Sequence, residues 1–165
     1  MGAKDAELLF ELDQDVEVMR YINGGKITTK REIHEVYLPR LAKYTDAEKG
    51  WGMWKVMISQ TNQFIGWILV RPVSFFSERP QWDNLELGWR FNRFAWGCGY
   101  ATEAARHVMH AIADSQGISK FSAIAMPNNE ASIRIMKKLG MKFLRSELNK
   151  DPLGDIEVVY YELDL

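Results

Sequence analysis

The chain has 165 residues, the length of one ordinary domain. Apolar residues make up 47% and charged residues 26%, as in globular proteins. The 21 Lys and Arg residues are balanced by 22 Asp and Glu residues, so the cationic surplus of a nucleic-acid-binding protein is missing. The apolar run 64–70 is too short to cross a bilayer. We expect one domain over residues 1–165 that binds neither nucleic acid nor membrane.

Cysteine and histidine usage indicates a compartment and excludes a metal site. Cys98 is the one cysteine, so no internal disulfide can form. The three histidines are scattered, and none lies at metal-ligand spacing from other ligand types. The first residues lack the apolar segment of a secretion signal. These features predict a cytoplasmic protein without a metal.

The first third of the chain has helical periodicity. Leucine, valine and methionine residues recur at helical spacing over 5–21, and Gly24 ends this predicted helix. Thr29 and Glu32 form a capping-box pattern that opens a second helix. Pro39 should kink or split the second helix, which predicts a separate short helix over 40–46.

The rest of the chain alternates between strand and helix patterns. Residues 51–59 and 63–70 predict a β-hairpin, and 75–84 a loop. Further strands are predicted over 85–91, 121–125, 141–147 and 156–163, and helices over 100–114 and 129–139. This order predicts an α+β fold with a central twisted, mixed and mostly antiparallel sheet flanked by helices.

Gly97 and Gly99 stand between a predicted strand and a helix. Glycines at a helix start let the backbone approach a ligand, and the free N–H groups there bind phosphate or pyrophosphate. A plain tight turn is the alternative. A phosphate-binding Walker loop is excluded because no Lys follows the glycines. A dinucleotide fingerprint is excluded because position 102 is Thr and the next strand runs into Met126-Pro127-Asn128.

Two motifs together resemble a known family. Leu87-Gly88-Trp89-Arg90 is followed by W-G-C-G-Y-A-T-E-A from position 96, and N-x-x-S at 129–132 is followed by K-L-G-M at 138–141. Over 85–143, the chain is similar to the GNAT superfamily of N-acetyltransferases, especially the branch of the ribosomal-protein acetyltransferases RimJ and RimL. A weaker likeness covers 13–22. Family members begin with a strand before the first helix; here that strand is missing or reduced, which leaves one sheet edge unprotected.

The resemblance implies a site for acetyl-CoA as co-substrate, without a metal. The pantetheine arm would bond along the backbone of Trp89, Arg90 and Phe91, like an added strand. Asn129 would hold the end of this arm, with Ser132 near the sulfur. Trp96 stands where the family often has Gln or Arg and uses only its backbone. The pyrophosphate would lie on the N–H groups of Gly97, Cys98, Gly99, Tyr100, Ala101 and Thr102.

Acetyl transfer to an amine also needs proton-transfer groups. Ser132 is the candidate acid, because Met136 stands where many family members have a tyrosine. Glu86 is the candidate base; the alternative is a solvent-facing residue paired with Arg90. A backbone N–H near Trp89 or Arg90 would stabilise the oxyanion, at a bulge in the strand. Deprotonation at pH 7 costs little over ~1 kcal/mol for an α-amine, but about 4.6 for a lysine, so a weak base favours an α-amine.

The acceptor side has no motif. Trp51, Trp54, Trp67 and Trp82 fit sheet packing or, alternatively, an aromatic acceptor pocket. Acidic residues over 147–165 fit a solvated sheet face or a site for a cationic acceptor. Tyr160 and its neighbour point to opposite faces, so only one of the two could reach a site.

The sequence thus predicts an enzyme that moves acetyl from acetyl-CoA to a primary amine by direct attack in a ternary complex. The acceptor is a protein N-terminal α-amine or a small-molecule amine, and the enzyme a monomer or homodimer. Cys98 is not the nucleophile, because it lies in the pyrophosphate loop. The alternatives are a CoA-binding regulatory domain of weak activity and an α+β binding domain unrelated to CoA.

Overall fold

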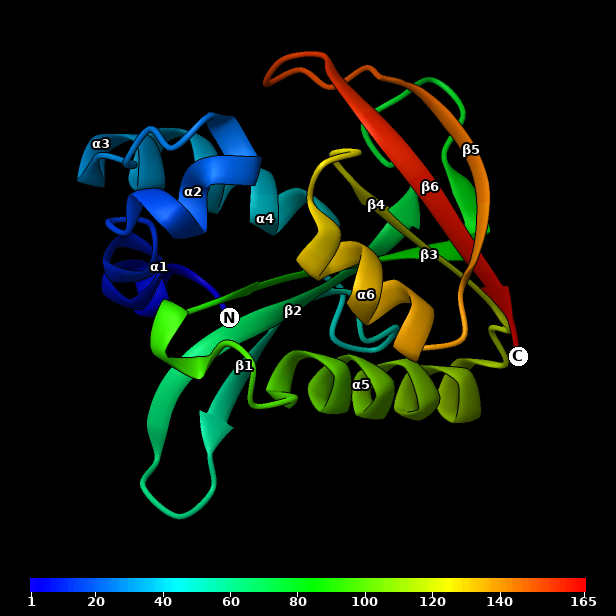
Figure 1. Ribbon diagram of the computed structural model, residues 1–165, viewed down its shortest axis with the longest axis horizontal. Coiled ribbons are helices and arrows are strands. Elements are labelled where there is room, and N and C mark those ends of the chain that lie inside the picture. Colours follow the sequence, from blue (N-terminus) through cyan, green and yellow to red (C-terminus); the bar gives the residue numbers. More distant parts are fainter.

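The computed structural model describes residues 1–165 as six strands in one sheet with helices on both faces (Figure 1). The helical elements are η1 Ala3–Asp5, α1 Ala6–Leu12, α2 Val16–Asn23, α3 Lys30–Glu32, η2 Ile33–Tyr37, α4 Leu38–Tyr44, η3 Arg93–Ala95, α5 Tyr100–Gln116 and α6 Glu130–Lys138. The strands are β1 Gly52–Ile58, β2 Gln63–Val73, β3 Gln81–Phe91, β4 Lys120–Ala125, β5 Lys142–Asn149 and β6 Ile156–Asp164. None of the helices is both long enough and apolar enough to cross a membrane.

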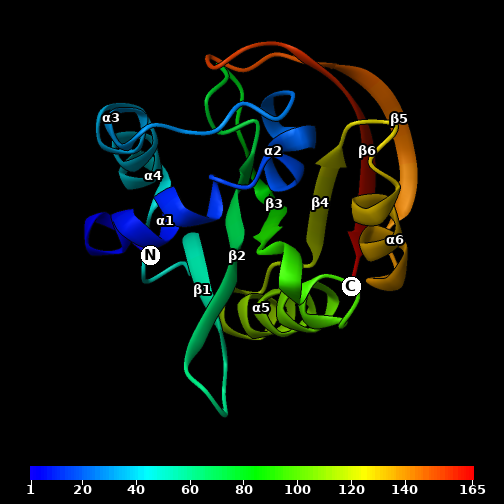
Figure 2. The same ribbon diagram turned by 60° about the vertical axis from the view of Figure 1, so that its left-hand side comes forward.

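The sheet has the strand order β1-β2-β3-β4-β6-β5. Every neighbouring pair is antiparallel except β3 and β4, which run parallel because α5 connects them (Figure 2). The prediction of a mixed, mostly antiparallel α+β sheet is therefore confirmed. The parallel pair is also the shortest ladder: it joins Asn84–Glu86 to Lys120–Ser122 and then ends, so the two strands diverge.

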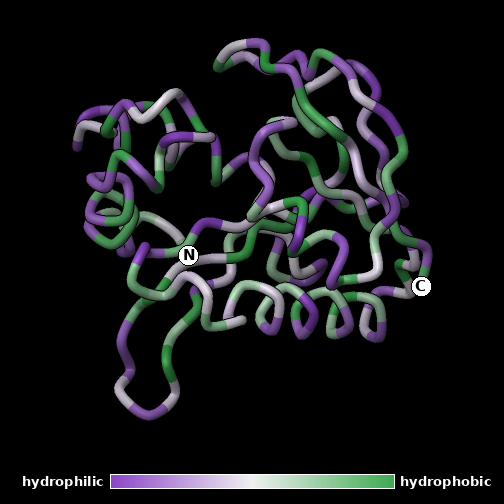
Figure 3. The backbone as a smooth tube through the Cα atoms, in the orientation of Figure 1, coloured by the Kyte–Doolittle hydropathy of each residue, from purple (hydrophilic) through white to green (hydrophobic).

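Alternation along the strands builds a separate core on each face. In β2, Ile68 and Val70 belong to the core under α5 and α6, whereas Trp67 and Leu69 belong to the core under α1, α2 and α4. Figure 3 shows hydrophobic central strands and a hydrophilic hairpin tip, as this two-sided burial requires. The sheet is the shared wall between the two cores.

The N-terminal helix prediction was wrong in its length. The expected helix over 5–21 is broken into α1 and α2 at Asp13–Asp15, and its first residue belongs to the short 3₁₀ helix η1. Asp13 is buried and its carboxylate accepts hydrogen bonds from Thr28 and Arg90, while Asp15 caps α2 through the backbone N–H of Glu17. Periodicity cannot show such contacts, because they depend on residues far along the chain.

Pro39 does not split its helix. The capping box of Thr29 and Glu32 is present, and α3 continues through the π-helix η2 directly into α4. Pro39 lies in the first turn of α4, where its missing N–H is tolerated after a π-turn. The predicted loop over 75–84 was too long, since β3 begins at Gln81.

No strand precedes α1, so β1 forms one edge of the sheet, as the sequence led us to expect. The first residues lie against this strand, where the N-terminal amine donates to the carbonyl oxygen of Met53.

Candidate functional site

The divergence of β3 from β4 opens a cleft. A cavity of about 420 Å³ lies there, lined by α2, the second half of β3, the segment that precedes α5, the first turn of α5, and one side of α6 along its length. The predicted site residues on its wall are Trp89, Arg90, Phe91, Trp96, Gly97, Gly99, Tyr100, Ala101, Thr102, Asn129 and Ser132. Residues from three separate segments of the sequence therefore meet in one cavity.

The loop before α5 presents bare backbone to this cavity. Gly97 and Gly99 have φ angles of 75° and 85°, a conformation that is strained for any residue with a side chain. The space beside them is open, because a Cβ on either would meet no atom within 4 Å. The N–H groups of residues 97–102 donate to no acceptor in the protein, whereas the N–H of Glu103 already bonds to Gly99. Six consecutive free donors at the start of a 17-residue helix form a site for an anion.

The backbone of β3 supplies further free groups. Alternate residues of an antiparallel strand turn their N–H and C=O to opposite neighbours. Asn92 donates to Ile65 of β2, whereas the Phe91 carbonyl accepts from the Trp96 indole on the other side. Trp89 therefore turns its N–H and C=O into the cleft, and the backbone of Arg90 turns toward β2.

The strand does not bulge where a bulge was expected. Pairing of β2 with β3 is regular through Trp89 and Arg90, and its one irregularity is at Pro72 and Val73. The prediction of a bulge near Trp89 or Arg90 was wrong. The free backbone at Trp89 arises instead because β4 departs, which leaves that side of β3 unpaired.

Helix α6 brings polar side chains to the opposite wall. The carboxamide oxygen of Asn129 caps the helix by accepting from the N–H of Ser132, which leaves the amide nitrogen for a ligand. The Trp89 indole nitrogen donates to the Ser132 hydroxyl at 3.3 Å, so the hydroxyl hydrogen is free to be donated elsewhere. Met136 is fully buried in the core and faces no cleft.

Helix α2 and two cations complete the cavity, and no sequence motif predicted them. Tyr21 and Ile22 form part of the wall, and Arg134 and Lys138 of α6 also line it. The signal was the weak family likeness over 13–22. Cys98 does not line the cavity; its exposed thiol lies near the carbonyl oxygen of Trp96.

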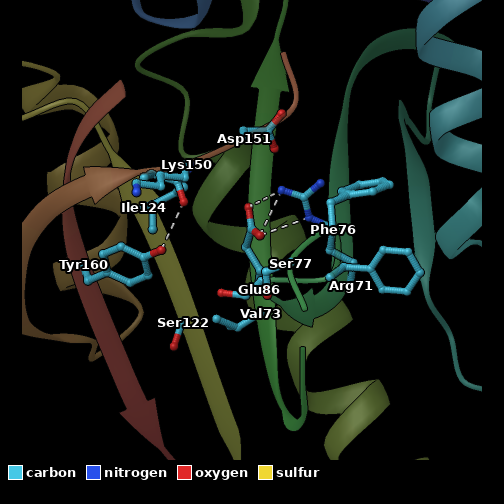
Figure 4. A pocket seen from close by; sticks show the side chains of 13 residues that line it. Arg71, Val73, Phe76, Ser77, Glu86, Ser122, Ile124, Lys150, Asp151 and Tyr160 are labelled. Atoms are coloured by element: carbon cyan, nitrogen blue, oxygen red, sulfur yellow. Dashed lines mark hydrogen bonds and ion pairs between the residues drawn. The ribbon is translucent and has the colours of Figure 1, made fainter. Parts of the chain in front are cut away.

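Glu86 lies at the apex of the split, on the face that carries α1 to α4. It pairs with Ser122 in the last step of the β3–β4 ladder and lines a second, small pocket of about 40 Å³ (Figure 4). Arg71 of β2 grips its carboxylate with two hydrogen bonds of 3.0 Å, and both side chains are less than one-sixth exposed. The predicted alternative pair with Arg90 was wrong, because Arg90 bonds to Asp13.

Two titratable groups near Glu86 have shifted pKa values. Burial alone would lower the pKa of Arg71, but the adjacent carboxylate of Glu86 outweighs it and raises that pKa, so Arg71 stays charged. Burial, reinforced by Glu147 and Glu86, raises the pKa of Tyr160 to about 12. Tyr160 is therefore a neutral phenol at neutral pH, and it faces this pocket while Tyr161 lies in the core under α5 and α6.

The four tryptophans considered for an acceptor pocket, Trp51, Trp54, Trp67 and Trp82, line neither of the two pockets. Trp67 is buried under the N-terminal helices, and Trp51 stacks on Trp82 with ring centroids 5.9 Å apart. Several C-terminal carboxylates are ion-paired; Asp151 bonds to Arg40 and Glu147 to Arg145.

The fold and the cleft define a class of protein in which a helix N-terminus and a split sheet together hold a long phosphorylated ligand. Residues 1–142 match the family model described as the acetyltransferase (GNAT) domain. The chain belongs to the GNAT acetyltransferase family, as its motifs indicated.

Known relatives agree with this assignment. The chain is 29% identical over 153 residues to the FsC-acetyl coenzyme A-N(2)-transacetylase of Aspergillus fumigatus. The alignment covers 91% of this chain but only 63% of the fungal protein. It is 32% identical over 149 residues to the uncharacterized protein YkkB of Bacillus subtilis, covering 88% and 81% of the two chains. The chain thus spans less than two thirds of the fungal enzyme.

Solved structures share the fold. Aminoglycoside acetyltransferase AAC(6')-Ib in complex with coenzyme A superposes with a TM-score of 0.79 at 17% identity, covering 99% of this chain and 91% of that one. RimL, a ribosomal-protein α-N-acetyltransferase in complex with coenzyme A, gives 0.73 at 12% identity, with coverages of 98% and 89%. No group of three or more His, Cys, Asp or Glu residues in residues 1–165 could hold a metal ion.

Proposed function

We propose that the protein transfers an acetyl group from acetyl-CoA to a primary amine by direct attack in a ternary complex. The observation that carries this proposal is that one cavity holds both the free backbone donors of the glycine loop and the unpaired strand edge at Trp89. A pyrophosphate needs several N–H donors at a helix start, and an extended amide chain needs an unpaired strand edge. This cleft offers both, in the order in which coenzyme A carries them.

The residues that would hold acetyl-CoA follow from these free groups. The N–H groups of residues 97–102 suit the pyrophosphate, and Arg134 and Lys138 add positive charge beside it. The backbone of Trp89 and the amide nitrogen of Asn129 suit the pantetheine arm. Arg90 acts through its side chain instead, since its bond to Asp13 fixes the end of α1 against β3.

Ser132 is the proposed donor to the departing sulfur. Because its oxygen already accepts from the Trp89 indole, its own hydrogen is the part left to donate. A thiolate leaves more readily when a donor meets the developing charge. This arrangement supports Ser132 as the general acid, a role that the buried Met136 cannot perform.

Glu86 is the proposed base, but its ion pair with Arg71 limits its ability to accept a proton. Both of its oxygens accept from Arg71, so only its remaining lone pairs can take a proton from the acceptor. A base held in this way favours an acceptor amine that is easily deprotonated, such as an α-amine, rather than a lysine. An α-amine is also the acceptor type named for RimL, a ribosomal-protein α-N-acetyltransferase that shares this fold.

Acetyl-CoA binding and thiol release test the proposal. Calorimetry should give a dissociation constant for acetyl-CoA, and an amine panel that includes N-terminal peptides should release free CoA. Gly99→Ala should weaken acetyl-CoA binding by at least tenfold. Gly117→Ala is the matched control, because Gly117 lies at the other end of α5 with a φ angle of 67° and equally open surroundings. Equal affinity in both variants would overturn the proposal, and binding without CoA release would favour a regulatory domain.

A further inference from the structure

The small pocket beside Glu86 is asymmetric in its unused hydrogen-bonding groups. The nitrogen Nη1 of Arg71, the ammonium of Lys150 and the amide nitrogen of Asn149 have no partner in the protein. All three are donors. Of the other polar groups, the hydroxyl of Ser122 donates to Asn84 and Glu162, and the hydroxyl of Tyr160 donates to Asn149 Oδ1. The exposed hydroxyls of Ser74 and Ser77 can both donate and accept.

The charges around this pocket are also unequal. Arg71 is balanced by Glu86, and Arg40 is balanced by Asp151. Lys150, an exposed residue, forms no ion pair, so its positive charge is not balanced by a carboxylate. A polycationic acceptor would find no unpaired carboxylate here, whereas an acceptor with a carboxylate would find unpaired donors and a free positive charge.

The size of the pocket limits what the donors can hold. Its volume of about 40 Å³ has room for roughly three water-sized groups, because one water needs about 10–15 Å³ of such space. A carboxylate has three heavy atoms and only acceptor sites, which matches both the volume and the donors. The segment from Lys150 to Asp151, which the ion pair of Asp151 with Arg40 joins to α4, also lines the pocket (Figure 4).

We infer, on the basis of the proposed acetyl transfer, that the acceptor is a primary amine that carries a carboxylate within a few bonds of its nitrogen. The carboxylate binds to Arg71, Lys150 and Asn149, which directs the amine toward Glu86 at the apex of the split. The neighbouring cations disfavour an ammonium ion and so help to supply the neutral amine that attacks. The nitrogen gains the acetyl group and loses one proton, and CoA leaves with its sulfur protonated.

Such an acceptor has two sources, a free amino acid or an acidic first residue of a peptide. The test compares L-alanine with L-alaninamide, and a peptide beginning with Asp with the same peptide beginning with Asn. Thiol release should give a kcat/KM at least tenfold higher for the carboxylate member of one pair. The pair that shows the preference identifies the source. The alanine comparison is stringent, because alaninamide has the less basic amine and would react faster without a carboxylate site.

Lys150→Met should reduce this preference at least threefold, while Lys142→Met, an exposed and unpaired lysine on β5, should leave it unchanged. Equal rates within both pairs, faster release with spermidine, or no release with any acceptor would overturn the inference. Calorimetry with acetyl-CoA on the same samples separates the two proposals. Binding with the wrong acceptor preference contradicts only this inference, whereas absence of binding contradicts the acetyl-transfer proposal itself.

Discussion

The two sides of the split between β3 and β4 differ in the groups they present: one presents main-chain N–H groups, and the other presents side chains joined in ion pairs. The proposed cofactor side presents main-chain N–H groups from one continuous stretch, residues 97–102, and its glycines have open surroundings. The acceptor side presents side chains from distant segments, joined in the ion pairs Arg71–Glu86 and Arg40–Asp151. A backbone site tolerates most side-chain changes, whereas an ion-pair site depends on each member. This difference predicts where substitutions cause damage.

The largest effect is expected from Arg71→Met on the acceptor side. The variant leaves the nearly buried carboxylate of Glu86 unpaired, which should cost about 3–5 kcal/mol of unfolding free energy. Urea unfolding measures this loss. The double variant with Glu86→Leu should recover most of it, because neither charge then remains. A loss below ~1 kcal/mol in the single variant would show that the pair does not organise this side.

Ser132→Ala should lower kcat by about 10²-fold, the usual scale for one proton-transfer group. The affinity for acetyl-CoA should change less than threefold, because the backbone donors of the loop remain. Steady-state kinetics with calorimetry separates the two quantities, and Ser146→Ala, on the exposed part of β5, is the matched control. An unchanged kcat would remove Ser132 from the chemical step.

Alkaline pH should lower the free energy of unfolding. Burial, reinforced by Glu86, raises the pKa of Tyr44 to about 12, while the unfolded chain ionises near 10. The folded state therefore resists ionisation, so stability is complete below pH 10 and falls as the pH rises toward 12. The loss should reach about 2 kcal/mol.

Urea unfolding at pH 8 and pH 11 measures this dependence. Tyr44→Phe should remove about half of it, because Tyr160, whose pKa is also raised to about 12, still ionises less readily in the folded chain than in the unfolded chain. Tyr37→Phe, a partly buried tyrosine in the neighbouring η2, should leave the dependence as it is. An equally steep fall in Tyr44→Phe would assign the alkaline loss to other groups.

The smallest effect is expected from Cys98→Ala. Cys98 is exposed and does not line the cavity, so we expect only the backbone of this residue to matter. Both kcat and the KM for acetyl-CoA should stay within twofold of the original values in a thiol-release assay. A variant that binds CoA but loses the chemical step would make Cys98 a reacting group.

The same contrast explains how far the sequence could be interpreted. The glycine loop, the cap at Asn129 and the alternation of β3 are local features, so their residue types predict them. The contact of Asp13 with Arg90 spans 77 positions, and that of Arg40 with Asp151 spans 111. Only the folded sheet brings these residues together. For this reason Glu86 could be placed on the correct face of its strand but not with its partner Arg71.

The break of the first predicted helix has the same origin. Asp13 ends α1 because its carboxylate is buried against Thr28 and Arg90, and neither partner is visible in a local window. The free backbone of Trp89 was expected for the wrong reason. A departing neighbour strand exposes it, and a pattern within β3 cannot reveal where β4 leaves.

A crystal structure of the protein with coenzyme A would decide whether the glycine loop and β3 hold this ligand. We expect pyrophosphate oxygens within hydrogen-bond distance of the N–H groups of residues 97–102, and a pantetheine amide paired with the backbone of Trp89. Coenzyme A bound elsewhere, with the glycine loop closed or vacant, would contradict this expectation.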